Sequence, residues 1–296
     1  MLKIKPRPPF NFHLSAGIFS GDLFDGEYLC LIIRLDKKIA LACMKSTGSV
    51  EKPDLTVDLE SDEELSREDE RRVIELLSSM MNLDSDLNAF YELTKTDPVL
   101  APIVNDLRGL KVVHTQSLFE ALVNSIVEQQ IAFRIALKIE RSLLTGFGDR
   151  LNARGREYHA FPTPGRLASL SVEELRNCGL STRKAEYIRD LSEMVSDGIV
   201  DPESFRDYER SEDIVNELSA IRGIGPWTAK MAIMRSMRRF EILPVDDVGL
   251  RRCISHYCLD GRRISPQEAN EISKAWGEWR GLVAYYLVRA EMLESR

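Results

Sequence analysis

The chain has 296 residues, and its 44% hydrophobic and 29% charged side chains are usual for a water-soluble globular protein. It carries 47 acidic and 40 basic residues, a net charge of −7, and no apolar run approaches the roughly 18 residues of a membrane span, so we expect no membrane partner. The N-terminal MLKIKPRPPFNF lacks the apolar core of a secretory signal, so we expect a cytoplasmic protein of prokaryotic type.

The length of the chain and its cysteines set two further limits. A chain of this size can bury a sizeable core and is expected to divide into two or three compact units. The cysteines are scattered and odd in number, so we expect reduced thiols within hydrophobic cores. These are Cys30, Cys43, Cys178, Cys253 and Cys258.

The N-terminal part is predicted to be a small α/β domain over residues 1–82. Three runs with strong β propensity predict strands, at Tyr28–Leu35, Lys38–Thr47 and Leu55–Leu59. Asp36 and its neighbour between the first two runs indicate a hairpin. Ser61 and Glu64 have the spacing of a helix capping box, and helical periodicity covers Arg71–Met81. We interpret this domain as structural.

Beyond Asp84 every substantial segment has helical periodicity, which predicts an all-α domain over residues 83–296. Ser171 and Glu174 form a second capping box pattern, and Ser181 is placed to cap the next helix. Short connections favour one compact helical body whose two lobes flank a cleft. The expected helices are Ser117–Thr145, Lys184–Met194, Asp213–Ala220, Trp227–Met237, Asp247–Tyr257 and Pro266–Glu294. The predicted fold class is α+β and mainly α-helical.

A glycine-hydrophobic-glycine turn separates two of these helices, in the sequence LSAIRGIGPWTA. Gly223 and Gly225 are both able to take positive φ, and neither has a Cβ that would keep a phosphate away from backbone N–H groups. Pro226 suits the first position of the next helix, whose positive dipole end would face that phosphate. The alternative is an ordinary helix–helix turn with glycine at a C-cap.

The charges are unevenly distributed along the chain. Residues 51–75 hold 11 acidic and 4 basic side chains, whereas residues 222–252 hold 7 basic and 3 acidic ones. The second segment therefore predicts a small basic face, compatible with nucleic-acid binding through few phosphates. By itself, such a run is equally typical of a solvated surface.

The order of motifs resembles that of the helix-hairpin-helix DNA glycosylases, and within them the 3-methyladenine (alkylbase) branch. The turn is followed by an apolar helix and by PVDDVGLRR, whose aspartate in D-x-G-L-R-R matches the position of the catalytic residue in that family. Three further segments carry the resemblance: Phe119–Ile139, Cys178–Ile188 and Trp276–Leu287. The likeness extends from about Asp84 to the C-terminus and implies a helix-hairpin-helix glycosylase fold.

The resemblance implies that Asp247 is the catalytic residue. An aspartate before a helix is also a common N-cap, so a purely structural role is the alternative. Asp246 is the second candidate, because the register could shift by one residue. We prefer Asp247 because Gly249 and the residues after it align only in that register.

Hydrolysis of an N-glycosidic bond builds positive charge at the sugar, as in other glycoside hydrolysis, and one carboxylate can stabilise it. An alkylated purine is already cationic and leaves without a strong acid, so we expect no cofactor for the chemistry. In relatives with lyase activity, a lysine lies two residues after the second hairpin glycine. Trp227 occupies that place, and Lys230 lies about 4.5 Å of helical rise further on. We therefore predict a monofunctional hydrolase.

The resemblance also implies how the damaged base is reached. The base must leave the helical stack, and the segment Gln129, Gln130 and Ile131 matches the loop that fills the resulting gap. Ordinary surface glutamines are the alternative. The predicted base pocket consists of Trp227, Phe133, Tyr285 and Arg289. A buried core tryptophan, and a structural tyrosine with a surface arginine, remain open as alternatives.

The remaining expectations concern DNA and ions. Gly223, Ile224, Gly225, Thr228 and Arg251 are predicted to contact the DNA backbone. The carbonyl groups of Ser219, Ile221 and Gly223 match the family's site for a monovalent cation, sodium or potassium. An iron–sulfur cluster is not expected, because its four closely spaced cysteines are missing.

The predicted partner is double-stranded DNA that contains damaged bases, and we expect a monomer. Two alternative functions stay open. One is a non-catalytic helix-hairpin-helix module that holds DNA, which would not need Asp247 or the pocket aromatics. The other is a glycosylase for oxidised purines with lyase activity, which Trp227 disfavours.

Overall fold

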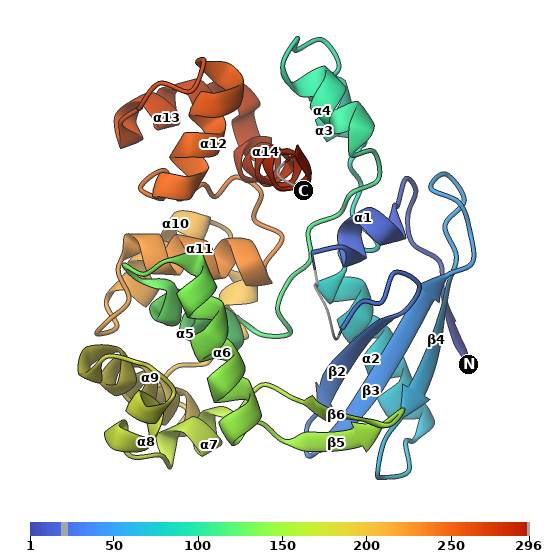
Figure 1. The fold of residues 1–296 in the computed structure, drawn as a ribbon, viewed down its shortest axis with the longest axis vertical. Helices are drawn as coiled ribbons and strands as arrows, with labels where there is room; N and C mark the ends of the chain where they lie inside the picture. Colours follow the sequence, from blue (N-terminus) through green and yellow to red (C-terminus); the bar gives the residue numbers. More distant parts are fainter. Residues whose placement is uncertain (19–22, 295–296) are drawn as a thin grey trace.

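The computed structural model describes residues 1–18 and 23–294 and contains a small antiparallel sheet beside a larger helical body (Figure 1). The strands are β1 (Leu2–Ile4), β2 (Leu29–Leu35), β3 (Lys38–Ser46) and β4 (Leu55–Glu60), in the order β1-β4-β3-β2. The helix α2 (Arg67–Met80) packs on the sheet, and the short α1 (Phe12–Ala16) adds Phe12 to the same core. The three strands expected from the sequence are confirmed, and Asp36 makes the hairpin with a φ of 44°.

The start of α2 differs from the expectation. Ser66 and Asp69 form its capping box, whereas the Ser61 hydroxyl donates to the Ile39 carbonyl in the sheet. Both serines are followed three residues later by an acidic side chain, so spacing alone could not separate the two candidates. The strand β1 was not expected, because three residues are too few to show a period.

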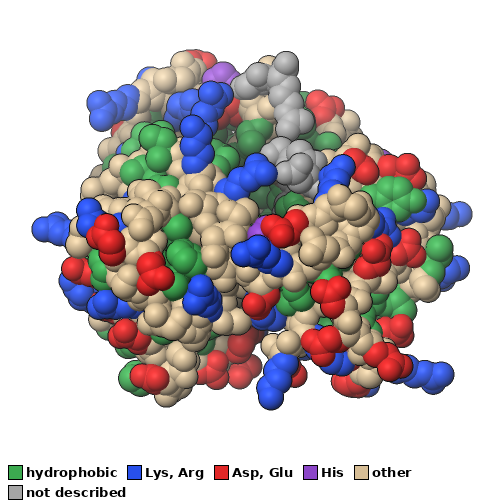
Figure 2. All heavy atoms as spheres, turned by 60° about the horizontal axis from the view of Figure 1, so that its bottom comes forward, with side chains coloured by type: hydrophobic (Ala, Val, Ile, Leu, Met, Phe, Trp, Pro, Cys, Tyr) green, Lys and Arg blue, Asp and Glu red, His purple; other side chains and the backbone are tan. Residues whose placement is uncertain are grey.

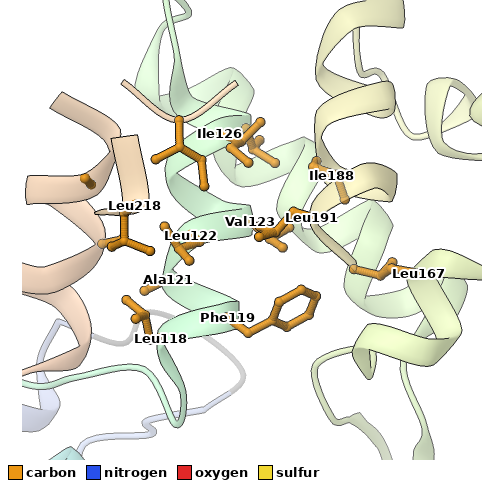
Figure 3. Close-up of a cluster of buried hydrophobic side chains, with 14 of the residues drawn as sticks. Leu118, Phe119, Ala121, Leu122, Val123, Ile126, Leu167, Ile188, Leu191 and Leu218 are labelled. Atoms are coloured by element: carbon orange, nitrogen blue, oxygen red, sulfur yellow. The ribbon is translucent and has the colours of Figure 1, made fainter. Parts of the chain in front are cut away.

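Two hydrophobic cores organise the helices. The first is built around α5 (Leu118–Glu128), which lies between the helix carrying Leu218 and the helices carrying Ile188 and Leu167 (Figure 3). Its other helices are α6 (Phe133–Phe147), α7 (Pro164–Ala168), α8 (Val172–Asn177), α9 (Thr182–Ser196), α10 (Ser211–Ser219) and α11 (Pro226–Ser236), with a 3-10 turn at Ser204–Asp207. The Ser171–Glu174 capping box and the Ser181 cap are confirmed at α8 and α9.

The second core joins α12 (Val248–Cys258), α13 (Pro266–Ser273) and α14 (Arg280–Glu294) to α3 (Asn88–Thr94) and α4 (Leu100–Asp106). The second core therefore combines helices that precede the first core in the sequence with helices that follow it, and it lies above the first core in Figure 1. The predicted boundary at residue 82 stays a prediction: Leu83 packs in the sheet core and Leu87 in the second helical core. Within residues 1–18 and 23–294, no helix is long and apolar enough to cross a membrane.

Two of the expected long helices are interrupted. Ser117–Thr145 is divided into α5 and α6 by a turn over residues 129–132, where Gln130 has a φ of 54°. Pro266–Glu294 is divided by a 3-10 segment, Lys274–Trp279, in which Gly277 has a φ of 53°. A hairpin, β5 (Arg150–Ala153) with β6 (Arg156–His159), was also not expected, because each strand has only four residues.

The expectation of five reduced cysteines is wrong for two of them. Cys30 on β2 and Cys43 on β3 form a disulfide, and the other three cysteines are free. The pair depends on the strand register, which places these two residues directly opposite each other. The number and spacing of the cysteines do not contain this register. The β5–β6 hairpin covers the bond, since Leu151 and Tyr158 pack in the same small core.

Candidate active site

A cleft of about 1850 Å³ runs between the two helical cores and the sheet. It brings together most of the predicted site residues, which come from α6, α11, α14, the turn between α5 and α6, and the loop that leads into α12. Those on its wall are Gln129, Gln130, Ile131, Phe133, Trp227, Asp246, Asp247, Tyr285 and Arg289. The residues predicted for the DNA backbone and for a cation lie outside the wall: Ser219, Ile221, Gly223, Ile224, Gly225, Thr228 and Arg251.

Asp247 is the N-cap of α12, and its two carboxylate oxygens have different partners. Oδ1 accepts the Leu250 backbone N–H at 2.8 Å, which caps the helix. Oδ2 accepts the indole N–H of Trp227 at 3.2 Å, across the cleft from α11. The carboxylate therefore caps the helix and faces the cleft at the same time, beside the positive end of the helix dipole. The capping role does not exclude a catalytic one.

Trp227 occupies the wall position where lyase relatives are expected to have lysine. Its side chain is half-buried, and its N–H points at Asp247. Lys230 is not part of the wall. Of the described residues that line the cleft, none is a lysine. Within that part of the chain, the cleft offers no side-chain amine for a Schiff base.

The structure separates the three residues expected to fill the gap in DNA. Gln129 turns inward: its amide nitrogen donates to the Gly223 carbonyl at 2.8 Å and to the Thr228 hydroxyl at 2.9 Å. Gln130 is exposed in a left-handed conformation, and Ile131 is half-buried against the first core. Gln130 is thus the exposed glutamine of the turn, whereas the Gln129 side chain connects the turn to the hairpin.

Lys184 reinforces the same turn from α9. Its ammonium donates to the Val127 carbonyl at 2.7 Å and to the Gln129 carbonyl at 2.6 Å. Partial burial lowers the pKa of this lysine. The conformation of the turn is therefore determined by long-range contacts that sequence periodicity cannot show.

The predicted base pocket receives a contribution from the N-terminal domain. Phe133 is 58% exposed at the start of α6, and Tyr285 is half-buried on α14, where burial raises its pKa to about 12. Arg289 is buried, and its guanidinium donates to the Leu14 carbonyl of α1 at 3.2 Å. The expectation that Tyr285 and Arg289 share one cleft-facing side of a helix is consistent with their place on the wall.

Sequence reasoning missed a polar stripe on the cleft side of α5. Glu120, Asn124 and Glu128 recur at four-residue spacing on an otherwise apolar helix, and that spacing was the available signal. Burial raises the pKa of Glu120 to about 7, and it does the same for Glu140 on α6. Glu128 is paired with Arg235 at 2.7 Å.

The hairpin supports only part of the expectation about its glycines. Gly223 has a φ of 90°, and a Cβ there would lie 2.2 Å from the Tyr187 ring. Gly225 has a φ of −93° and is extended, so it does not need positive φ, but a Cβ there would meet nothing within 4 Å. Gly225 is the N-cap of α11 and Pro226 its first residue. The first N–H groups of α11 have no intrahelical acceptor and are available to an anion.

The carbonyls predicted to hold a monovalent cation are partly engaged already. The Gly223 carbonyl accepts the Gln129 amide, and the Ile221 carbonyl accepts the Ile224 N–H at 3.0 Å. Each oxygen keeps a second lone pair. The donor set of Ser219, Ile221 and Gly223 therefore fits a weakly bound cation, and the cation stays a prediction.

Most cations of the basic face predicted for residues 222–252 are already engaged within the protein. Salt bridges hold Arg222, Arg235, Arg238 and Arg252, and backbone carbonyls hold Arg239 and Arg251. Arg251 donates to the Val245 carbonyl at 2.9 Å, next to the loop that leads to Asp247. On the face shown in Figure 2, acidic and basic side chains are likewise intermingled. Counting charges along the segment overstated the positive charge available to DNA.

Comparison with known proteins agrees with this geometry. Residues 123–278 match the HhH-GPD superfamily of base excision DNA repair proteins. A DNA-3-methyladenine glycosylase of Bacillus subtilis is 33% identical over 73% of this chain and 71% of its own length.

Two solved structures share the fold. A 3-methyladenine DNA-glycosylase from Archaeoglobus fulgidus has a TM-score of 0.86 and 24% identity, covering 97% of both chains. An 8-oxoguanine glycosylase/lyase of Clostridium acetobutylicum, in complex with double-stranded DNA, has a TM-score of 0.70 and 19% identity, covering 90% of this chain and 88% of its own. The superfamily match spans more than half of the chain and includes the hairpin and Asp247. The resemblance to the alkylbase branch is therefore confirmed, and the chain belongs to the HhH-GPD superfamily of base excision DNA repair proteins.

Proposed function

We propose that this protein is a monofunctional DNA glycosylase that hydrolyses the N-glycosidic bond of alkylated purines in duplex DNA. The observation that carries the proposal is the Asp247 carboxylate. It caps the N-terminal end of α12, and one of its oxygens faces the cleft and contacts Trp227. The name of the Bacillus subtilis relative, DNA-3-methyladenine glycosylase, supports the substrate class.

The target nucleotide rotates out of the duplex into the cleft, because its sugar cannot otherwise reach Asp247. The bond between C1′ and the base nitrogen breaks, and its electron pair leaves with the base. Positive charge grows at C1′, where the Asp247 carboxylate stabilises it. Water then adds to C1′ and releases one proton to the solvent, which leaves a hydroxyl group on the sugar. A base alkylated on a ring nitrogen is cationic and accepts the electron pair without prior protonation. The products are the free base and an abasic site.

Trp227 has two roles in this scheme. Its N–H fixes the orientation of Asp247 Oδ2, and its ring presents an aromatic surface beside the pocket. Because the described wall has no lysine, we propose that water and not an amine attacks the sugar. Borohydride should consequently trap no protein–DNA adduct, and strands should break only after treatment with hot alkali. A trapped adduct that disappears when Lys230 is replaced would contradict the monofunctional assignment.

The deciding experiment uses DNA treated with a methylating agent, from which released purines are separated by chromatography. Asp247→Asn should reduce base release by about 10²- to 10³-fold, since it removes stabilisation of the transition state only. Its affinity for duplex DNA should stay within a few-fold of wild type. Asp246→Asn is the matched control, because Asp246 is adjacent and exposed and does not cap α12. An inactive Asp246→Asn beside an active Asp247→Asn would show that the register is wrong by one residue.

A further inference from the structure

The first two turns of α6 have an unusual surface for a charged, soluble protein. Phe133, Ile135 and Leu137 are 58%, 52% and 46% exposed. They make up three of the nine large hydrophobic side chains that are exposed among the described residues, within five consecutive positions. An exposed apolar cluster of this kind marks an interaction surface more often than a scattered single residue does.

Two cations lie among these apolar side chains. Arg134 and Lys138 are exposed and four residues apart, so they are neighbours on one side of the helix. Neither takes part in an ion pair with any residue in the described ranges, 1–18 and 23–294. Like charges at this spacing repel each other and destabilise a helix. The helix maintains an unfavourable pair without an internal partner.

Several other cations on the helices and 3-10 turns are compensated within the protein. Acidic side chains three residues earlier pair with Arg71, Arg176, Arg206 and Lys274. Most arginines near the hairpin are also engaged, so Arg134 and Lys138 differ from both of these groups. A polyanion is the partner that would compensate them and also accept contact with apolar side chains.

The position of α6 indicates which part of the DNA it meets. The turn over residues 129–132 joins α5 to α6 and is bonded to the hairpin through Gln129 and the Gly223 carbonyl. Gln130 is exposed on that turn. Along the chain, Gln130 therefore separates Gln129, which contacts the hairpin, from the start of α6. If the hairpin holds the strand with the lesion, the element beyond Gln130 faces the other strand.

We propose that the exposed face of α6 binds the strand opposite the lesion. Arg134 and Lys138 contact its phosphates, and Ile135 packs on its sugars. None of these three residues lines the cleft, whereas Phe133 and Leu137 do. The helix thus divides its exposed residues between the base pocket and the second strand. This inference rests on the proposed function, because it places the lesion strand on the hairpin.

The test compares binding to a duplex that contains an abasic analogue with binding to the lesion strand alone, by fluorescence anisotropy. The double variant Arg134→Gln/Lys138→Gln should bind the duplex about tenfold more weakly and lower the salt slope, d log K/d log[salt], by about 1.8 in magnitude. Single-strand affinity should change less than twofold. Lys37→Gln/Arg67→Gln removes two exposed cations of the N-terminal domain and is the matched control, with duplex affinity unchanged.

A second experiment neutralises the phosphates of the proposed partner strand instead of changing side chains of the protein. Neutral methylphosphonate linkages in the strand opposite the lesion should weaken wild-type binding and eliminate the difference between wild type and the double variant. The same linkages in the lesion strand should leave that difference in place. Ile135→Thr should lower duplex affinity without changing the salt slope. Thermal melts should show all these variants folded, since the replaced side chains are exposed.

Several results would overturn the proposal. These are an equal loss of affinity for single strand and duplex, an equal effect of the control pair, or a difference that disappears only with neutral linkages in the lesion strand. The proposed function is tested separately, because it fails if the wild-type protein releases no methylated purine. If wild type releases bases and the α6 variants bind the duplex normally, only the strand assignment fails.

Discussion

Residues 222–252 and the first two turns of α6 both have more basic than acidic side chains, but they differ in what their cations contact. In the first segment, six of seven cations are bonded to carboxylates or carbonyls. On α6, Arg134 and Lys138 have no partner in the described part of the chain. The comparison shows that the number of basic residues in a segment does not give the number left without a partner inside the described part of the protein. We expect the hairpin to bind phosphate through backbone N–H groups and α6 through charge.

The largest expected effect on stability comes from a hairpin glycine, because its role depends on backbone conformation and close packing and not on charge. Gly223→Ala should lower the free energy of unfolding by about 2–4 kcal/mol, since alanine at positive φ is strained and its Cβ meets the Tyr187 ring. Chemical denaturation measures this. Gly225→Ala is the control, because its Cβ has free space and its φ is negative.

Gly225→Ala should leave the unfolding free energy within about 1 kcal/mol of wild type. It should nonetheless weaken duplex binding by placing a methyl group between the phosphate and the N–H groups of α11. Its salt slope should be unchanged, because no cation is removed. A reduced slope would mean that the hairpin binds through charge after all, and the contrast with α6 would fail.

The link between the two regions is the next target. Gln129→Ala leaves the Gly223 carbonyl and the Thr228 hydroxyl without their partner, which should cost about 1–3 kcal/mol of unfolding free energy. Gln130→Ala should change stability by less than about 0.5 kcal/mol, because its side chain is exposed, and should reduce base release from paired lesions instead. Equal destabilisation by both variants would contradict the division of roles within the turn.

A pH dependence should arise on the inner side of α6. The ordinary pKa of glutamate is 4.5, whereas burial holds that of Glu140 near 7, so rising pH ionises the unfolded chain first. Stability from this group is fully present below about pH 4.5 and is lost as pH rises through 7. Glu140→Gln should therefore show a smaller fall in unfolding free energy between pH 5 and 8 than wild type, measured by urea titration. Identical pH profiles would mean that Glu140 titrates normally.

The smallest effect is expected at Arg222, the hairpin cation most similar to those of α6 in exposure. Its guanidinium contacts Glu186 at 2.9 Å and Asp190 at 2.8 Å. Arg222→Gln should change duplex affinity less than about twofold, because exposed and already paired charges contribute little. Anisotropy titrations at several salt concentrations measure this. A salt slope lowered by about 0.9 would show that Arg222 reaches a phosphate, and would remove the distinction between the regions.

Local chemistry could be predicted from the sequence more reliably than contacts between distant residues. The caps at Ser171 and Ser181, the hairpin glycines and the place of Asp247 before a helix all depend on a few neighbouring residues. The break between α5 and α6 depends on Lys184 and Gln129, whose partners lie 55 and 94 residues away. Helical periodicity continues through that turn without a glycine or proline to mark it, so the sequence alone predicted one helix.

The candidate site shows the same limit. Asp247 and Trp227 were identified from a motif, but their hydrogen bond depends on two helices of different cores. The neutralisation of Arg222 and the pairing of Cys30 with Cys43 follow from register and packing, which composition does not contain. Counting residue types therefore gave the wrong redox state for two cysteines and the wrong location for available positive charge.

The contact between Arg289 and the Leu14 carbonyl has a consequence for how the protein is made. The two residues are 275 positions apart, so their contact forms only after two widely separated segments of the chain have both been synthesised. A nascent chain that has reached the end of α12 already contains the hairpin and Asp247, but not the side of the cleft that α14 forms. Synthesis thus delays completion of the cleft until α14 has emerged and met the N-terminal domain.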